Sequence, residues 1–468
     1  MMGALMFGAD QGNYGLVQDM QSFFDYWCKP NYPGFECTPG SKGHAPVGWI
    51  EFLSFGGSLI TVGAATGSLL CGPVIATACG RRLCITVGGL GCFIGCLFAS
   101  FLAFRSTDVF YFGRFLTGFG VGITCYSLPV YNSEVATAGI RGIMGSMFQC
   151  MVISGGVLAA LVLSVVTDWR VGMLLPGIAG AVVSVCIWFC PESPTWLMEN
   201  RGFESGKEAL RRIRKGSVEA EADGIRMAAE AESVVGKVSC ADLFTRPGLR
   251  KRVFIACWLQ IGQQLTGVNA FLFYTTDLFI AAGIPAGEIN SLPGFAIYFN
   301  LAMLAGCILG LGLIDTTYGG RKRQLLIASV FMGPPLIIAA AAMQFGWSGW
   351  ISVVMVFLYG PGFQFAWGIV PWLYPAEIFL ASERDRAVSL STFCNFFVNF
   401  LVTFVTAPLM SWNAPGTFLL FGVLNVTNLI FVSSMVLETR GKSLMANVEE
   451  YDKDLAERVS LTDSTAAR

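Results

Sequence analysis

Two residues of opposite charge, Asp10 and Arg114, lie inside apolar segments, where an ionisable side chain is costly. Asp10 is in LMFGADQG and Arg114 is in GRFLTGFGVG. A charged group at the centre of a membrane span costs about 2.5–3.5 kcal/mol, so it indicates a functional site and needs a partner. Burial favours a neutral carboxyl group, whereas a nearby guanidinium favours the carboxylate. The pair could therefore take up and release a proton, or it could be a permanent buried salt bridge.

Neutral amide side chains recur in the same apolar segments. They are Gln149, Gln260, Gln263, Gln264, Asn269, Asn300, Gln364, Asn395 and Asn399. Gln260 and Gln264 are four residues apart, so both lie on one helix face. The aromatic residues nearby are Phe273, Tyr274, Phe363 and Trp372. Few polar groups in apolar walls are typical of ligand pockets, and amides with aromatic surface suit a neutral polyhydroxyl ligand. A single amide could instead join two membrane helices.

The elements that position these residues are expected to be membrane helices. Apolar residues make up 54% of the 468-residue chain, charged residues only 13%, and mean hydropathy is +0.61; soluble domains carry about 25% charged residues. Twelve apolar runs cover residues 1–20, 49–77, 83–104, 108–131, 142–166, 171–190, 250–282, 293–314, 323–344, 349–379, 387–410 and 414–437. Each is near or above the ~20 residues that cross a bilayer. The sequence predicts an all-α membrane protein with twelve transmembrane helices.

The chain repeats itself, which predicts two pseudo-symmetric six-helix halves. Tyr131, Glu134 and Arg141 recur as Tyr374, Glu377 and Arg384, an offset of 243 residues (374 − 131). We expect a first half at 1–191, a cytoplasmic helical linker at 192–249, a second half at 250–437 and a tail at 438–468. Internal repeats in an apolar chain are typical of transporters, whose site lies between the repeats.

Lysine and arginine predict the orientation, because cytoplasmic loops are richer in both. If both termini are cytoplasmic, the outer loops hold only Lys29, Lys42, Arg105 and Arg170. The first run begins at Met1 without a basic flank, so a cleavable signal peptide is not expected. Either residues are missing before it, or the helix begins flush with the membrane. We expect a multi-pass protein of the plasma membrane.

Six charged residues at the predicted cytoplasmic helix ends could form a gate. They are Glu134, Arg141, Glu192, Glu377, Arg384 and Glu438. Exposed ion pairs are worth only about 0–1 kcal/mol each, which suits a gate that must also open; the alternative is solvated rim charges. Cys28 and Cys37 share the first outer loop, where they could form a disulfide or remain free thiols. The cysteines show no metal-ligand spacing.

Six segments, in order along the chain, resemble the sugar porter family of the major facilitator superfamily. They are GRFLTGFGVG (113–122), PVYNSEVATAGIRG (129–142), PESPTWL (191–197), QQLTGVNAFLFY (263–274), WGIVPWLYPAEIF (367–379) and ETRGKSL (438–444). The resemblance implies a twelve-helix fold, alternating access and a sugar substrate. By this resemblance, sugar-contacting positions match Gln149, Gln263, Gln264, Asn269, Trp372 and Asn395. Asp10 and the cysteine-bearing loop are most similar to plant and algal proton–hexose symporters.

Three departures from the family pattern concern charges and loops. The acid expected in D-x-x-G-R-R is replaced by Thr77, the loop after Asp315 is one residue longer, and Leu437 stands in place of a proline. The sequence favours a proton-coupled hexose symporter that works as a monomer in lipid. Two alternatives remain: a facilitative uniporter with Asp10–Arg114 as a fixed pair, or a non-transporting sugar sensor. No enzyme, cofactor, metal or nucleic-acid partner is expected, given the net charge of −1 and no visible catalytic set.

Overall fold

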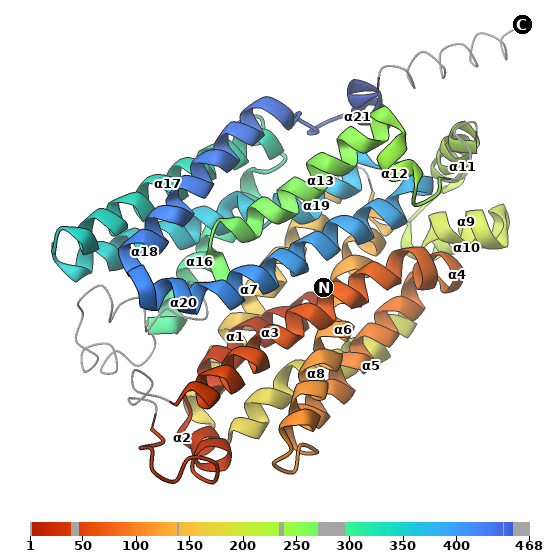
Figure 1. The fold of residues 1–468 in the computed structure, drawn as a ribbon. Helices are drawn as coiled ribbons and strands as arrows, with labels where there is room; N and C mark the ends of the chain where they lie inside the picture. Colours follow the sequence, from red (N-terminus) through yellow and green to blue (C-terminus); the bar gives the residue numbers. More distant parts are fainter. Residues whose placement is uncertain are drawn as a thin grey trace, which may run out of the picture.

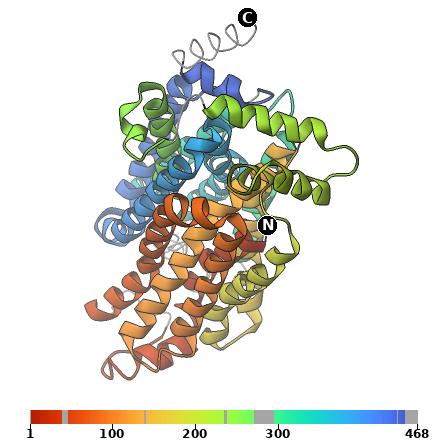
Figure 2. The same ribbon diagram turned by 90° about the vertical axis from the view of Figure 1, so that its right-hand side faces the viewer.

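A computed structural model describes residues 2–38, 46–137, 140–233, 238–269, 295–442 and 444–452. Within these ranges the regular structure is helical, and it forms two bundles that lie side by side (Figures 1 and 2). The helices α9 to α12 and α21 gather at one end of the molecule, which we call the linker end, and α2 lies at the opposite end. The predicted fold class is confirmed.

The first bundle contains six apolar helices. They are α1 (Met2–Val17), α3 (Val47–Leu70, continued by η3, Cys71–Ala76, and α4, Thr77–Cys79), α5 (Arg81–Ser100), α6 (Thr107–Val135), α7 (Arg141–Val165) and α8 (Trp169–Cys186). Short segments α2 (Gln21–Phe23) and η1 (Phe24–Cys28) follow α1, and η4 (Ile187–Phe189) follows α8. The linker forms α9 (Pro194–Arg201), α10 (Phe203–Ile213), α11 (Glu219–Ser233) and α12 (Asp242–Thr245).

The second bundle also follows the predicted apolar runs. It consists of α13 (Pro247–Leu265), α16 (Phe295–Leu313), α17 (Arg321–Gln344), α18 (Gly349–Gly362) with η5 (Phe363–Trp367) and α19 (Val370–Ile378), and α20 (Ala381–Met435); α21 (Leu444–Tyr451) comes last. The 55 residues of α20 are too many for one span, since 20 residues already cover about 30 Å. Asn413 has non-helical φ/ψ and divides α20 into two spans. Of the described residues, eight helices are long and apolar enough to cross a membrane.

Close packing of α3 on α6 depends on glycines. A Cβ atom at Gly118 would overlap the carbonyl oxygen of Ile60, and one at Gly122 would overlap that of Ala64. A Cβ atom at Gly63 would meet the carbonyl oxygen of Phe115 in the same way. Small residues four apart let membrane helices approach closely. The two backbones are therefore near enough for Arg114 on α6 to reach the backbone of α3.

The loop after α1 is held by a disulfide between Cys28 and Cys37, whose Cα atoms are 5.8 Å apart. The loop packs on a buried aromatic group formed by Phe23, Phe24, Trp27, Trp49, Phe52, Phe110 and Trp169. This cluster ties the end of α1 to α3, α6 and α8. The disulfide thus fastens a cap on the end of the first bundle opposite the linker end.

We expect Cys28 and Cys37 to be recovered as one cross-linked peptide when the protein is unfolded without reductant, alkylated and mapped by mass spectrometry. Cys28 and Cys37 are buried, with 0% and 3% exposure, so thiol labelling of the folded protein would not distinguish a disulfide from two buried thiols. Addition of a reductant before alkylation should release two separately alkylated cysteines. Alkylation of both residues without reductant would show that they are free thiols.

Candidate functional site

The two charges singled out in the sequence meet in the first bundle. Nη1 of Arg114 donates a 3.1 Å hydrogen bond to Oδ1 of Asp10, and both residues are buried, with 2% and 4% exposure. Nε of Arg114 donates to the carbonyl oxygen of Gly56 at 2.8 Å, and the guanidinium lies 4.5 Å from the ring centroid of Tyr14. Arg114 therefore has a carbonyl and an aromatic face as partners in addition to the carboxylate of Asp10.

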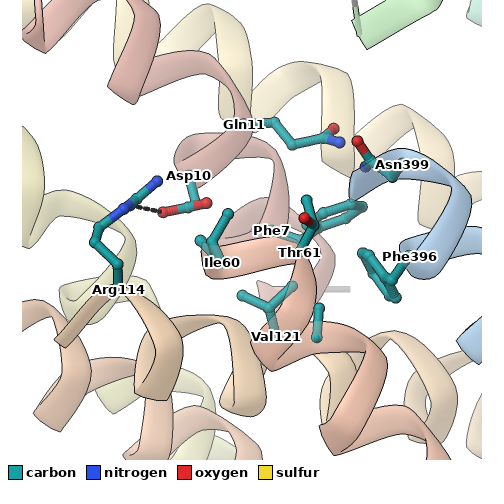
Figure 3. Close-up of a pocket in the computed structure, with 10 residues that line it drawn as sticks. Phe7, Asp10, Gln11, Ile60, Thr61, Arg114, Val121, Phe396 and Asn399 are labelled. Atoms are coloured by element: carbon teal, nitrogen blue, oxygen red, sulfur yellow. Dashed lines mark hydrogen bonds and ion pairs between the residues drawn. The ribbon is translucent and has the colours of Figure 1, made fainter. Parts of the chain in front are cut away.

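A pocket lies directly beside this pair. It is partly open to solvent, and its empty space, with the open part included, is about 360 Å³. Its lining comes from α1, α3 and α6 of the first bundle and α20 of the second: Phe7, Asp10, Gln11, Ile60, Thr61, Ala64, Arg114, Val121, Phe396 and Asn399. Figure 3 shows Gln11 and Asn399 extending towards one another from α1 and α20. The pocket is thus shared by the two halves, with an acid in its wall.

Five of the predicted amides of the second half form one buried hydrogen-bond network. Gln264 donates to Asn395 at 2.9 Å, and Asn395 donates to Gln260 and Gln263 at 2.7 Å each. Asn269 donates to Gln264 at 2.5 Å. The outer members are fixed to the backbone, because Gln260 donates to the carbonyl of Pro371 and Gln263 to that of Trp367. The structure therefore brings together five of the ten predicted sugar-site residues.

Helix α20 connects this amide network to the pocket. Asn395 belongs to the network, and the next residue, Phe396, lines the pocket. Phe396 contacts Phe7 at a centroid distance of 5.8 Å and Trp372 at 6.3 Å. Trp372 in turn contacts Phe148 at 5.5 Å. Aromatic rings from both halves thus form a chain of contacts that begins next to the amide network and reaches the pocket.

Gln149 and Gln364 join the two halves directly. Nε2 of Gln149 on α7 donates to Oε1 of Gln364 at 3.1 Å. Gln364 lies in η5, a π-helical turn, and such turns are frequent at functional sites. Asn300 also lies between the halves, since a Cβ atom at Gly156 of α7 would be 3.2 Å from its Oδ1 atom.

One predicted aromatic residue, Phe363, is placed away from the pocket. Phe363 is 3% exposed and stacks on Tyr359 at 6.4 Å within the core of the second half, so the described contacts are those of packing. Phe273 lies outside the described residues. Phe7, Gln11 and Phe396 also line the pocket but are not among the residues predicted from the sequence, although Phe7 is one helical turn before Asp10 and therefore on the same face.

The residues that recur in the two halves of the sequence make equivalent contacts at the linker end. Arg81 donates twice to Glu134, and Arg321 donates twice to Glu377. Glu192 accepts from the first backbone N–H groups of α5, and Glu438 accepts from those of α17, a stabilising arrangement at helix N-termini. The hydroxyl of Tyr131 donates to Pro191, and that of Tyr374 donates to Leu437.

Among the residues that the structure describes, two ion pairs at the linker end cross between the halves. Arg384 lies 3.7 Å from Glu134, and Arg81 lies 2.9 Å from Asp385. Glu377 binds a partner within its own half, whereas Glu192 binds the first half and Glu438 binds the second half. Arg141 is the first residue of α7, and its side chain is outside the described part. Asp385 is not among the residues predicted from the sequence, because no helix pattern identifies a partner 304 residues away.

Comparisons with known proteins identify the family. The family described as "Sugar (and other) transporter" matches residues 1–451. "Sugar transporter ERD6-like 16" of Arabidopsis thaliana is 30% identical over 404 residues, 84% of this chain and 81% of the relative. "Facilitated trehalose transporter Tret1-2 homolog" of Drosophila simulans is 32% identical over 424 residues, 87% and 83% of the two chains.

Solved structures show the same fold. A structure of the major facilitator superfamily proton:xylose symporter XylE, bound to 6-bromo-6-deoxy-D-glucose, matches with a TM-score of 0.81 and 22% identity over 96% of each chain. The chain therefore belongs to the sugar transporter family: it is an integral, multi-pass membrane protein with the twelve-helix major facilitator fold, and a transporter rather than an enzyme.

Proposed function

We propose that this protein is a proton-coupled monosaccharide symporter that works by alternating access. The observation that carries the proposal is the position of Asp10, an ionisable carboxyl group in the wall of a pocket shared by both halves, paired with Arg114 at 3.1 Å. An acid at this place costs energy that a passive pocket would not require. The name of XylE, a proton:xylose symporter, supports the coupling.

In the proposed cycle, Asp10 exchanges its proton when the pocket faces outward. Protonation removes the charge that holds Arg114 and gives the carboxyl group an O–H donor in addition to an acceptor. The guanidinium keeps its hydrogen bond to Gly56 and its contact with the ring of Tyr14. Sugar binding between the pocket and the amide network then favours closure over the sugar. Deprotonation on the inner side restores the ion pair and releases the sugar.

The proposed sugar site uses both parts of the arrangement. Amides of the network and Gln149 provide donors and acceptors for hydroxyl groups, and the rings of Trp372, Phe396 and Phe7 provide surface for the C–H faces of a sugar. We also propose that Phe273 and Asn300 contact the sugar. The ion pair between Arg384 and Glu134 is proposed to close the linker end while the opposite end is open. Arg141, Glu192, Glu377 and Glu438 are proposed to belong to the same gate.

We also propose how the protein is oriented in the membrane and how its chain is divided into domains. We place the linker end and both termini in the cytoplasm of a plasma-membrane protein, because of the bias in Lys and Arg. The proposed boundaries are 1–191, 192–249, 250–437 and 438–468, with the monomer as the functional unit.

A facilitative carrier is the second candidate, and a specific observation favours it. A relative that is 32% identical is named a facilitated trehalose transporter, which indicates passive transport of a disaccharide. In that case Asp10 and Arg114 would stay paired throughout the cycle. The site geometry is compatible with this role, since a fully paired buried salt bridge can be purely structural.

Uptake of a labelled sugar panel into cells without their own sugar transporters separates the candidates. The panel contains glucose, galactose, fructose, xylose and trehalose, with and without a protonophore. We expect a monosaccharide to accumulate above its outside concentration, and accumulation should collapse when the protonophore is added. Transport that equilibrates the sugar without accumulation, at a rate indifferent to protonophore and external pH, would establish the facilitative carrier instead.

A further inference from the structure

Arg81 of the first half and Arg321 of the second half occupy equivalent positions, but one of the acids that pair with each arginine comes from a different part of the chain. Nη1 of Arg81 donates to the carbonyl oxygen of Ala76, and Nη1 of Arg321 donates to that of Ile314. Each arginine also makes the paired contacts to Glu134 or Glu377 described above. The residue after Ile314 is Asp315, which binds Arg321 at 2.6 Å. The residue after Ala76 is Thr77, so the first half has no acid at the equivalent position.

Asp385 of the second half fills this place in the first half. Its Oδ1 atom accepts hydrogen bonds from Arg81 at 2.9 Å and from the hydroxyl of Tyr126 at 2.7 Å. Its Oδ2 atom is 3.4 Å from the hydroxyl oxygen of Thr77 itself. Arg81 therefore has two carboxylate partners, like Arg321, but one of them comes across the boundary between the halves.

The contact has no counterpart on the other side of the molecule. At the repeat offset of 243 residues, Asp385 corresponds to Gly142 and Tyr126 corresponds to Ile369. Neither residue has a polar side chain. A Cβ atom at Gly142 would already meet the carboxylate of Asp315, so that acid occupies the equivalent space from its own loop. The acid thus comes from the other half, at position 385, for Arg81, and from the neighbouring loop, at position 315, for Arg321.

The helix that carries Asp385 packs tightly on the first half. A Cβ atom at Gly72 in η3 would overlap the carbonyl oxygen of Asp385. One helical turn later, the hydroxyl of Ser389 donates to the carbonyl oxygens of Ser68 and Leu69. Residues four apart share a helix face, so Asp385 and Ser389 act along one line of contact. The side chain of Arg81 is 4% exposed and that of Asp385 is 15% exposed.

We propose that Asp385 is a latch residue: it replaces the acid absent at position 77, and it converts an ion pair that stays within one half into one that joins the two halves at the linker end. The inference rests on the proposed alternating access, because the halves must part there for the linker end to open. The Arg321–Asp315 pair can remain intact during that motion, whereas the Arg81–Asp385 pair must break. Opening of the linker end must therefore break this contact between α20 and α5.

Three variants of the full-length protein test the latch: Asp385→Asn, the double variant Thr77→Asp/Asp385→Asn, and Asp315→Asn as the matched control within one half. The double variant is designed to keep two carboxylates on Arg81 without the link between halves. Hydrogen–deuterium exchange with mass spectrometry, in detergent without sugar or gradient, reports opening at η3–α4 and at the first turns of α20. This readout is independent of transport, so failure of the symport proposal would not alter it.

We expect Asp385→Asn and the double variant both to raise the local opening equilibrium by about tenfold or more. Asp315→Asn should raise exchange only around 314–321. Protection of α5 and α8 serves as the folding control; if the single variant does not fold, the double variant still supplies the measurement. Wild-type protection at α20 in the double variant would show that Asp385 only neutralises Arg81. Unchanged exchange in Asp385→Asn would likewise overturn the latch.

Discussion

Replacement of Asp10 by asparagine should abolish accumulation of the sugar against its gradient while sparing exchange of sugar across the membrane. Asparagine keeps the size of the side chain but cannot take up or release a proton. At one proton per sugar, each pH unit across the membrane supports about tenfold accumulation. We therefore expect the ratio of inside to outside sugar to fall from well above one to about one. The measurement is steady-state accumulation of labelled sugar, together with counterflow in preloaded vesicles.

The fixed-pair alternative predicts a different pattern for the same residue. If the Asp10–Arg114 pair is only structural, removal of one partner leaves a buried charge and costs about 3–5 kcal/mol of stability. Asp10→Asn would then fold poorly, and Asp10→Asn combined with Arg114→Met would restore both folded protein and the wild-type transport rate. In the symporter, the double variant should stay uncoupled even when it is stable. Wild-type accumulation in Asp10→Asn would eliminate the proton-coupling role.

Replacement of Gln264 by alanine should weaken the apparent affinity for sugar without preventing delivery of the protein to the membrane. The loss of one neutral hydrogen bond to the sugar costs about 0.5–1.5 kcal/mol, which is roughly a 2- to 13-fold rise in KM. A further loss is expected because Gln264 also orients Asn395 and Asn269, at 2.9 and 2.5 Å. Initial uptake rates over a range of sugar concentrations, normalised to surface protein, measure the change.

Asn428 provides a matched control for this prediction. It is a buried amide that donates to the carbonyl oxygen of Gly262, on the same helix α13 that carries Gln264, but it lies outside the amide network. Asn428→Ala should lower thermal stability and leave KM unchanged. If both alanine variants changed stability alone and neither changed KM, the network would be a structural element and not part of the sugar site.

The sequence does not distinguish an amide of the network from an amide that only joins two helices. Gln264 and Asn428 are both neutral amides in apolar helices, and spacing along the chain does not reveal what each one faces. The grouping of Gln260, Gln263, Gln264, Asn269 and Asn395 could be anticipated only in part, since Asn395 comes from a helix more than 130 residues away. Phe363 is an aromatic residue of the kind expected to stack on a sugar, yet its described contacts lie in the core of the second half.

The sequence by itself determined the features that depend on composition, length and repetition. A bilayer requires about 20 apolar residues for each span, so twelve spans and two halves follow from local pattern. It also identified Asp10 and Arg114 as partners, because buried opposite charges must compensate one another. Only the tertiary structure decided which ordinary residues, such as Phe7, Gln11 and Phe396, line the pocket, and that Arg81 takes its second carboxylate from Asp385. Those contacts depend on how each helix is rotated about its axis and where it crosses its neighbours. Close packing across both halves fixes the rotation and the crossing points only when the whole chain is assembled.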